Sequence, residues 1–80
     1  MTNLEKYKNA FAEGLGVSID QVEGLEYQGI AEWDSVGHMT LIDAIERALD
    51  ITMDTDDILE FSSFAKGKEI LEKNYDVKFD

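Results

Sequence analysis

The chain has 80 residues, and it contains no cysteine, no proline and no apolar run approaching 18 residues. Without cysteine the polypeptide has no disulfide framework, no thiolate metal site and no catalytic thiol of its own. The N-terminus also lacks a basic region followed by an apolar run, so neither export nor membrane spanning is expected. These absences predict a cytoplasmic protein, and the length predicts a single small domain over residues 1–80 with a modest core.

Basic residues are scarce in the middle of the chain. Residues 18–60 contain twelve acidic residues and one basic residue, Arg47, whereas the two ends hold six of each and sum to zero. The net charge of −11 therefore belongs entirely to the middle of the chain. Such a field repels nucleic acid and anionic membranes and attracts basic surfaces of partner proteins. A plainer interpretation also stays open, in which the acidic surface only keeps a small protein soluble.

Apolar residues recur at spacings of three and four in three segments, which predicts three longer helices. These segments are residues 3–15, 35–49 and about 64–74. A short helix is expected from Asp54 to about Glu60, because an aspartate N-cap and carboxylates in the first turn suit the helix dipole. The predicted fold class is all-α: a small antiparallel four-helix bundle with a short third helix and a long first loop.

The second predicted helix and the tail carry more specific expectations. Helix 35–49 is expected to turn one apolar stripe to the core, namely Val36, Met39, Ile42, Ile45 and Leu49. The tail alternates Tyr75, Val77 and Phe79 with polar residues, which is the periodicity of a strand. A lone strand needs a partner, so two structures stay open: a strand, or a segment whose aromatic side chains fold back on the bundle.

Ser35 directly follows Asp34 where the long loop meets the second predicted helix. If Asp34 caps this helix, the Ser35 hydroxyl is free and faces solvent in the first turn. A phosphate ester on it would lie at the positive end of the helix, although Glu32 and Asp34 would add repulsion. The alternative is that the pair serves only to cap the helix.

Catalysis and metal binding are weaker interpretations of the same residues. A Ser35–His38 dyad would lack an orienting group and a Gly-x-Ser-x-Gly elbow, so we expect no catalytic residue and no enzyme activity. The acidic cluster beginning at Asp54 does not form an EF-hand, because Leu59 replaces the glycine and Ala65 the final glutamate. No metal site is therefore expected.

Several motifs together resemble an acyl carrier protein, and the resemblance runs from about residue 4 to residue 73. Asp34-Ser35-Val36 is similar to the family's Asp-Ser-Leu attachment motif. The further matches are Gly16, Val17, Asp20 and Val22 at the start of the first loop, the acidic second helix, Met53, the short acidic third helix and the junction Phe61-Ser62-Ser63-Phe64. An Asp-Ser pair alone is a weak signal, but the pair at this position in a short acidic helical chain is a specific one.

The resemblance implies that Ser35, next to Asp34, carries 4′-phosphopantetheine through a phosphodiester. The thiol of that arm would hold an acyl group as a thioester, as in fatty acid or polyketide biosynthesis, and the protein would be a monomeric phosphoprotein that acts as a substrate. The implied partners are a phosphopantetheinyl transferase and acyl-loading and acyl-processing enzymes with basic patches. The candidate contacts for these partners are Met39, Asp43, Glu46, Asp50, Asp54 and Asp57.

The chain also departs from the family's pattern, at Trp33, Val36, Gly37-His38 and Asp54. These departures favour a carrier dedicated to a specialised pathway, such as polyketide, modified saccharide or aminoacyl transfer. Trp33 is expected to pack as a staple on the first turn of the helix, with a grip on the arm as the alternative. His38 is expected to be a solvated helix residue, with a pH-dependent partner contact as the alternative. The alternative function is an unmodified acidic interaction domain that binds a basic partner through helix 35–49.

Overall fold

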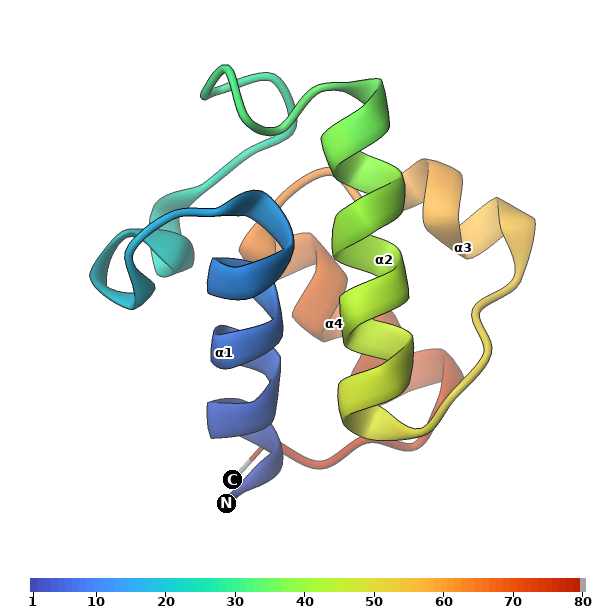
Figure 1. Ribbon diagram of the computed structural model, residues 1–80. Coiled ribbons are helices and arrows are strands. Elements are labelled where there is room, and N and C mark those ends of the chain that lie inside the picture. The colour runs from blue at the N-terminus through green and yellow to red at the C-terminus, as the bar shows by residue number, and fades with distance from the viewer. Residues whose placement is uncertain (80) are drawn as a thin grey trace.

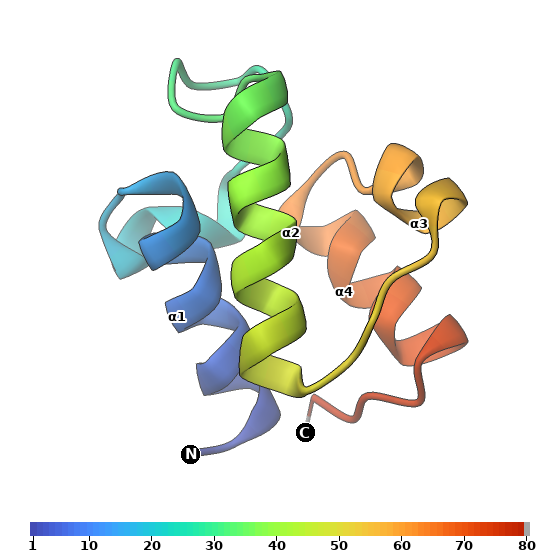
Figure 2. The ribbon, with the colours of Figure 1, turned by 45° about the vertical axis from the view of Figure 1, so that its right-hand side comes forward.

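The computed structural model describes residues 1–79, which form five helices and no strand. The helices are α1 (Asn3–Leu15), the 3-10 helix η1 (Ile19–Gly24), α2 (Ser35–Leu49), α3 (Thr55–Glu60) and α4 (Phe64–Asn74). In Figure 1, α1 and α2 lie side by side and run in opposite directions, α4 lies behind them, and α3 lies on the far side of α2 from α1. Figure 2 shows the same order from a second direction. The prediction of an all-helical fold is confirmed.

Local capping chemistry sets where the first helices begin and end. Thr2 caps α1 and forms a capping box with Glu5, and Gly16 ends the helix in the left-handed conformation at φ 69°. Hydrogen bonds from the backbone and side chain of Thr2 lower the pKa of the Glu5 carboxyl. Ser18 and Gln21 form a second capping box, which opens η1.

The centre of the core is aromatic. Tyr7 packs its ring against Phe64 at 4.7 Å and against Phe11 at 5.2 Å between centroids. Its hydroxyl donates a hydrogen bond of 2.7 Å to the Phe64 carbonyl, and burial raises the Tyr7 pKa far above its ordinary value. Phe61 lies over Gly67, where an added Cβ would meet the ring at 2.1 Å. The glycine that weakens the helical pattern of α4 is therefore required by this close packing.

The orientation of α2 differs from the predicted stripe. Leu41, Ile42 and Ile45 are buried, but Val36 is 74% exposed and Met39 56% exposed. The prediction that Val36 and Met39 line the core is therefore wrong. The inward position of the first turn belongs instead to His38, which lies three residues before Leu41, and a hydropathy pattern counts histidine as polar.

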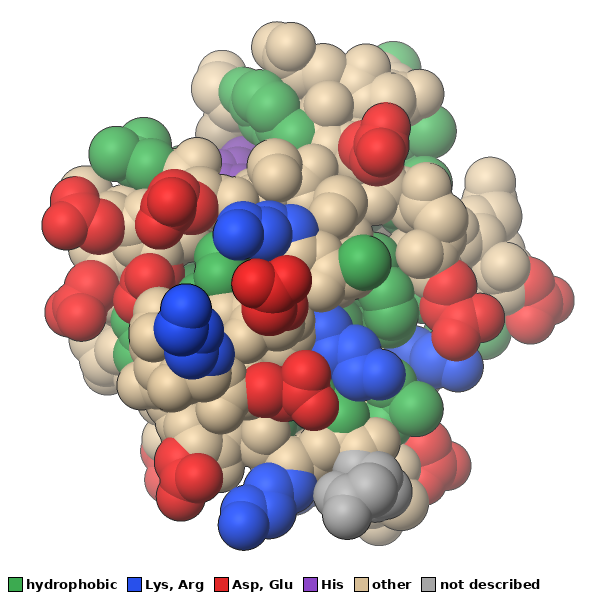
Figure 3. Space-filling model, turned by 180° about the vertical axis from the view of Figure 1, so that it is seen from behind, with side chains coloured by type: hydrophobic (Ala, Val, Ile, Leu, Met, Phe, Trp, Pro, Cys, Tyr) green, Lys and Arg blue, Asp and Glu red, His purple; other side chains and the backbone are tan. Residues whose placement is uncertain are grey.

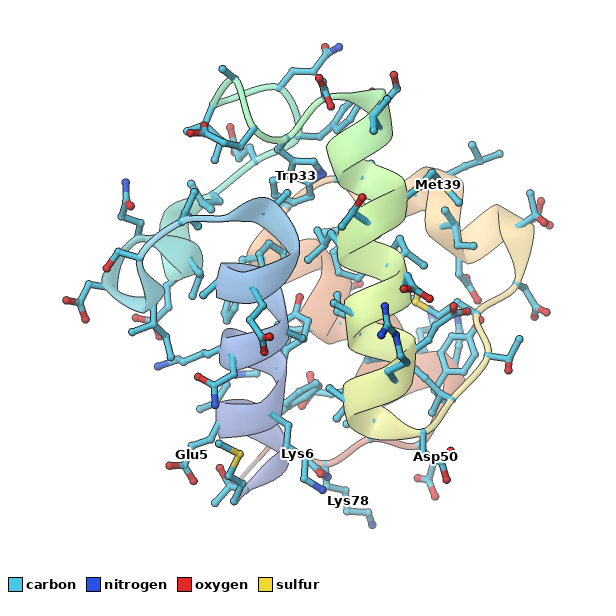
Figure 4. All side chains as sticks on the ribbon, in the orientation of Figure 1. Glu5, Lys6, Trp33, Met39, Asp50 and Lys78 are labelled. Carbon is cyan, nitrogen blue, oxygen red and sulfur yellow. The ribbon has the colours of Figure 1, made fainter. Side chains whose placement is uncertain are left out.

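The tail after α4 folds back on the helices rather than forming a strand. Val77 and Phe79 are buried, and the Phe79 ring lies 5.2 Å from that of Tyr7. The Asn3 side chain donates a hydrogen bond to the Lys78 carbonyl at 3.0 Å, which ties the tail to the start of α1. Figure 4 shows Lys78 at this end of the molecule. Of the two structures left open, the second is the one observed.

Candidate functional site

Ser35 is the first residue of α2, and its side chain is exposed. The preceding residue, Asp34, is the N-cap: its Oδ1 accepts a hydrogen bond of 2.8 Å from the Gly37 amide. The prediction that Asp34 caps the helix and leaves the Ser35 hydroxyl free is confirmed, because the side chain of Asp34 makes the capping bond. A substituent on Ser35 would extend into solvent from the N-terminal end of a 15-residue helix.

The loop before Ser35 is held to the rest of the protein at several points. The Tyr27 amide donates to the Ser62 carbonyl at 2.8 Å, and the Phe64 amide donates to the Leu25 carbonyl at 3.0 Å. Closer to the serine, the Gln28 amide donates to the Trp33 carbonyl at 2.9 Å. These bonds hold the loop against the start of α4 and close it on itself just before Ser35.

Gly37 lets this loop cross the first turn of α2 at very close range. A Cβ at this position would lie 2.0 Å from the Glu32 carbonyl oxygen, so any other residue would push the loop away. The close approach places Trp33 beneath the helix, where its side chain is completely buried. Gly37 is thus one cause of the buried position of Trp33.

Trp33 and His38 are joined by both packing and a hydrogen bond. The indole Nε1 donates to His38 Nδ1 at 2.9 Å, and the two ring planes lie within 16° of each other with centroids 6.1 Å apart. Because Nδ1 accepts this bond, the neutral ring carries its proton on Nε2 and donates it to the Ile58 carbonyl at 2.8 Å. The Trp33–His38–Ile58 bridge therefore connects the loop, the first turn of α2 and α3.

These contacts change the interpretation of both side chains. Trp33 is at the residue before the N-cap and His38 is the fourth residue of α2, which are the two positions of a staple, as predicted for Trp33. The prediction that His38 is solvated is wrong, because both ring nitrogens make hydrogen bonds inside the protein. The spacing of five residues between Trp33 and His38 is the sequence signal for their pairing. The second position of a staple is usually apolar, so the pattern does not point to a histidine.

Aromatic rings enclose the bridge. Tyr27 lies edge-on to His38 at 5.4 Å, and Phe61 does so at 6.1 Å. Phe11 lies edge-on to Trp33 at 5.3 Å. The space directly beneath the first turn of α2 is consequently filled with side chains.

No side chain of the short helix α3 is fully buried, although Ile58 packs partly against the core, and polar bonds hold the helix at both ends. At its start, the Tyr75 hydroxyl accepts from the Asp54 amide and donates to Asp57 Oδ2, each at 2.7 Å. Burial and the bond to Asp57 raise the Tyr75 pKa, although the Asp54 amide acts in the opposite sense. At its end, the Ile58 carbonyl accepts the bond from His38. Asp54 occupies the N-cap position as predicted, but its side chain makes no capping bond.

The predicted partner contacts divide into two groups. Met39, Asp43, Asp50 and Asp54 are exposed. Asp43 also pairs with Arg47 one turn along the helix, so part of its charge is offset locally.

The other two predicted contacts make bonds inside the fold. Glu46 Oε2 accepts a bond of 2.8 Å from the Met53 amide and so ties α2 to the segment before α3. Asp57 accepts bonds from the Asn74 amide group at 3.0 Å and from Tyr75. Substitutions at these two positions would therefore disturb the structure as well as the surface.

Exposed apolar side chains flank the serine. Val36 and Met39 on α2 and Leu59 on α3, which is 76% exposed, turn outward. Figure 4 shows Met39 on the side of α2 that faces α3. Arg47 is the one basic residue between residues 18 and 60. On the face seen from behind in Figure 3, Lys and Arg side chains lie among acidic ones. The neighbourhood of Ser35 combines apolar side chains with negative charge.

Two hollows of the described surface lie away from Ser35. One is a shallow groove between α1 and α2, floored by small residues that include Ala10, Ala44 and Ala48. The other is lined by polar residues at the start of α3 and the end of α4. Neither includes Ser35 among its lining residues, and the Ser35 side chain is exposed.

The comparisons with known proteins add nothing to this geometry: no protein-family model matches the chain, and no curated protein or solved structure is significantly similar to it. Among residues 1–79, none of the helices has the length and apolar character needed to cross a bilayer. Any assignment of function therefore depends on the residues themselves.

Proposed function

We propose that the protein is an acyl carrier protein modified at Ser35, with the helices arranged as the small antiparallel four-helix bundle of that family. The observation that carries the proposal is the arrangement at the start of α2: Asp34 makes the cap, and the adjacent Ser35 is exposed. A phosphodiester on this serine would face the positive end of the helix dipole without disturbing the core. The carrier itself would be a substrate of other enzymes rather than a catalyst.

The residues fit a 4′-phosphopantetheine group in two respects. The serine side chain is accessible to a transferase, and the chain contains no cysteine, so a thiol has to be supplied from outside. When attached, the group supplies that thiol on a flexible arm, which forms a thioester with an acyl group. The role of the chain's own residues is to hold the serine at a fixed helix terminus and to present the surface around it.

The surface around Ser35 supports docking of enzymes with basic patches. Val36, Met39 and Leu59 offer an apolar centre, and the exposed Asp43, Asp50 and Asp54 carry negative charge farther along, with Asp50 at the opposite end of α2 from the serine. We propose that a phosphopantetheinyl transferase and the acyl-loading and acyl-processing enzymes of a specialised pathway bind here. Contacts of this kind are weak, fast and sensitive to salt.

Mass spectrometry tests the attachment directly. Incubation with coenzyme A and a broad-specificity phosphopantetheinyl transferase should add the mass of one phosphopantetheine to the wild-type protein. Ser35→Ala should abolish the gain while circular dichroism remains helical. The matched control is Ser62→Ala at another exposed serine, which should be modified like the wild type.

Absence of a mass gain with several different transferases would refute the proposal. The alternative is an unmodified acidic interaction domain that uses the same face of α2. A basic partner that binds Ser35→Ala as tightly as wild type, but not the charge-reversed variant Asp43→Lys, would favour this alternative.

A further inference from the structure

The Trp33–His38–Ile58 bridge closes the way from Ser35 into the core between α2 and α3. His38 follows Ser35 by three residues, so the two lie on neighbouring positions of one helix face. From this position His38 spans to α3 through the hydrogen bond of 2.8 Å to the Ile58 carbonyl. A chain attached at Ser35 that turned inward between these helices would meet the bridge first.

Opening the bridge is unfavourable because of what it leaves behind. The Trp33 side chain is completely buried, and its Nε1–H has His38 Nδ1 as acceptor at 2.9 Å. Movement of His38 away from this position would leave a buried donor without a partner, which is more costly than losing a bond at the surface. The bridge is thus held on the side of the loop as well as on the side of α3.

The opposite end of α3 is also held by hydrogen bonds, so neither end of the helix is free to move outward. The Tyr75 hydroxyl contacts both the Asp54 amide and the Asp57 carboxylate. Just before α3, the Met53 amide is bonded to Glu46 of α2. Moving α3 away from α2 would break polar bonds at both of its ends.

The interior behind the bridge is already filled. Phe61 is 1% exposed and lies so close to Gly67 that a single added carbon would overlap its ring. Phe11 and Trp33 occupy the adjoining space edge to face. A long alkyl chain could enter only by displacing aromatic rings that are packed against one another.

We infer that this protein keeps its acyl group outside the helix core, in solvent beside α2, and that its cargo is a short or polar acyl group rather than a long alkyl chain. The inference rests on the proposed attachment at Ser35. A long alkyl chain would be stabilised by burial, but the closed core leaves no space for it. A short or polar acyl group loses little stability by staying in water, so the closed core favours such a cargo. Trp33 and His38 are then specificity-determining residues for the cargo.

The experiment compares an alkyl cargo with a small one on the same protein. Wild-type protein is loaded with acetyl- or octanoyl-phosphopantetheine from the corresponding acyl-coenzyme A, and loading is verified by mass. Failure of the attachment would appear as a missing mass gain and would count against the proposed function, whereas the present inference is tested only on protein that has been loaded. Hydroxylamine, which converts a thioester to a hydroxamate and a free thiol, then measures exposure of the thioester.

The two thioesters should be cleaved at rates within about twofold of each other, after each is normalised to its free acyl-pantetheine, because both are open to water. The indole N–H signal of Trp33, the single tryptophan of the chain, should have the same NMR position in both forms. Two results would overturn the inference. One is cleavage of the octanoyl thioester that is slower than that of the acetyl thioester by about tenfold or more, and the other is an indole signal that shifts in the octanoyl form alone.

A variant connects the result to the bridge. In His38→Ala the contact between α2 and α3 is no longer closed, so octanoyl should become protected relative to acetyl by about threefold or more. Equal cleavage in this variant would show that the bridge is not what excludes the chain. Thr40→Ala, an exposed substitution in the same helix, should behave as wild type. The comparison in the wild type decides the inference on its own if His38→Ala does not fold.

Discussion

Replacing His38 with alanine should destabilise the protein by about 1–4 kcal/mol, far more than is usual for a partly exposed helix residue. The buried Trp33 Nε1–H would lose its acceptor, at a cost of about 1–3 kcal/mol, and the bond to the Ile58 carbonyl would be lost at about 0.5–1.5 kcal/mol. The better helix propensity of alanine offsets about 0.5 kcal/mol of this destabilisation. Against a total stability of about 4–12 kcal/mol for a chain of this length, the effect is large.

A double-mutant cycle separates this bond from the other effects of the substitution. Trp33→Phe removes the donor but keeps an aromatic ring, so His38→Ala should cost less in that background by about 1–2 kcal/mol. Urea unfolding followed by circular dichroism suits all four proteins, because the variants with phenylalanine have no tryptophan fluorescence. Thr40→Ala is the matched control, and its coupling to Trp33→Phe should be close to zero. A coupling between Trp33 and His38 below about 0.5 kcal/mol would refute the proposed energetics of the bridge.

Two further predictions concern the core. Tyr7→Phe should cost about 1 kcal/mol at neutral pH because the bond to the Phe64 carbonyl is lost. Burial raises the Tyr7 pKa, so above the ordinary value of about 10 only the unfolded state ionises, and the wild type loses about 1.4 kcal/mol per pH unit. The variant should therefore be more stable than the wild type above about pH 11. A difference between their free energies of unfolding in urea that stays constant with pH would contradict this. Gly67→Ala should destabilise by about 1–3 kcal/mol despite alanine's better helix propensity, because the buried Phe61 ring leaves no room. Gly24→Ala, where nothing lies within 4 Å, is its control, and equal melting temperatures of the two variants would argue against the packing.

The parts of the fold that depend on neighbouring residues were predictable from sequence. The ranges 3–15, 35–49 and 64–74 coincide with α1, α2 and α4, because each combines an apolar period with a capping residue. The same locality explains why the cap by Asp34 and the exposure of Ser35 were predictable. Both follow from the backbone geometry at one helix terminus, with little influence from the rest of the chain.

Features that depend on distant partners were not predictable in this way. His38 bonds to a carbonyl twenty residues later, and the hydroxyl of Tyr75 reaches α3 across a similar separation. No apolar period reports such contacts. The predicted stripe through Val36 and Met39 is wrong for this reason: a hydropathy pattern counts histidine as polar, whereas His38 faces inward and bonds to Trp33 and Ile58.

Three departures from the acyl-carrier pattern that look independent in the sequence form one packing arrangement. Gly37 allows the Glu32 carbonyl to approach the helix, this approach buries Trp33, and the buried indole requires the acceptor that His38 provides. Because each residue makes the next one necessary, substitutions among the three should be coupled rather than additive. The arrangement fixes the backbone on both sides of Ser35 and leaves its hydroxyl exposed. A rigid helix terminus with an accessible serine is what the proposed modification needs, and the same residues that make it rigid close the core to a long acyl chain.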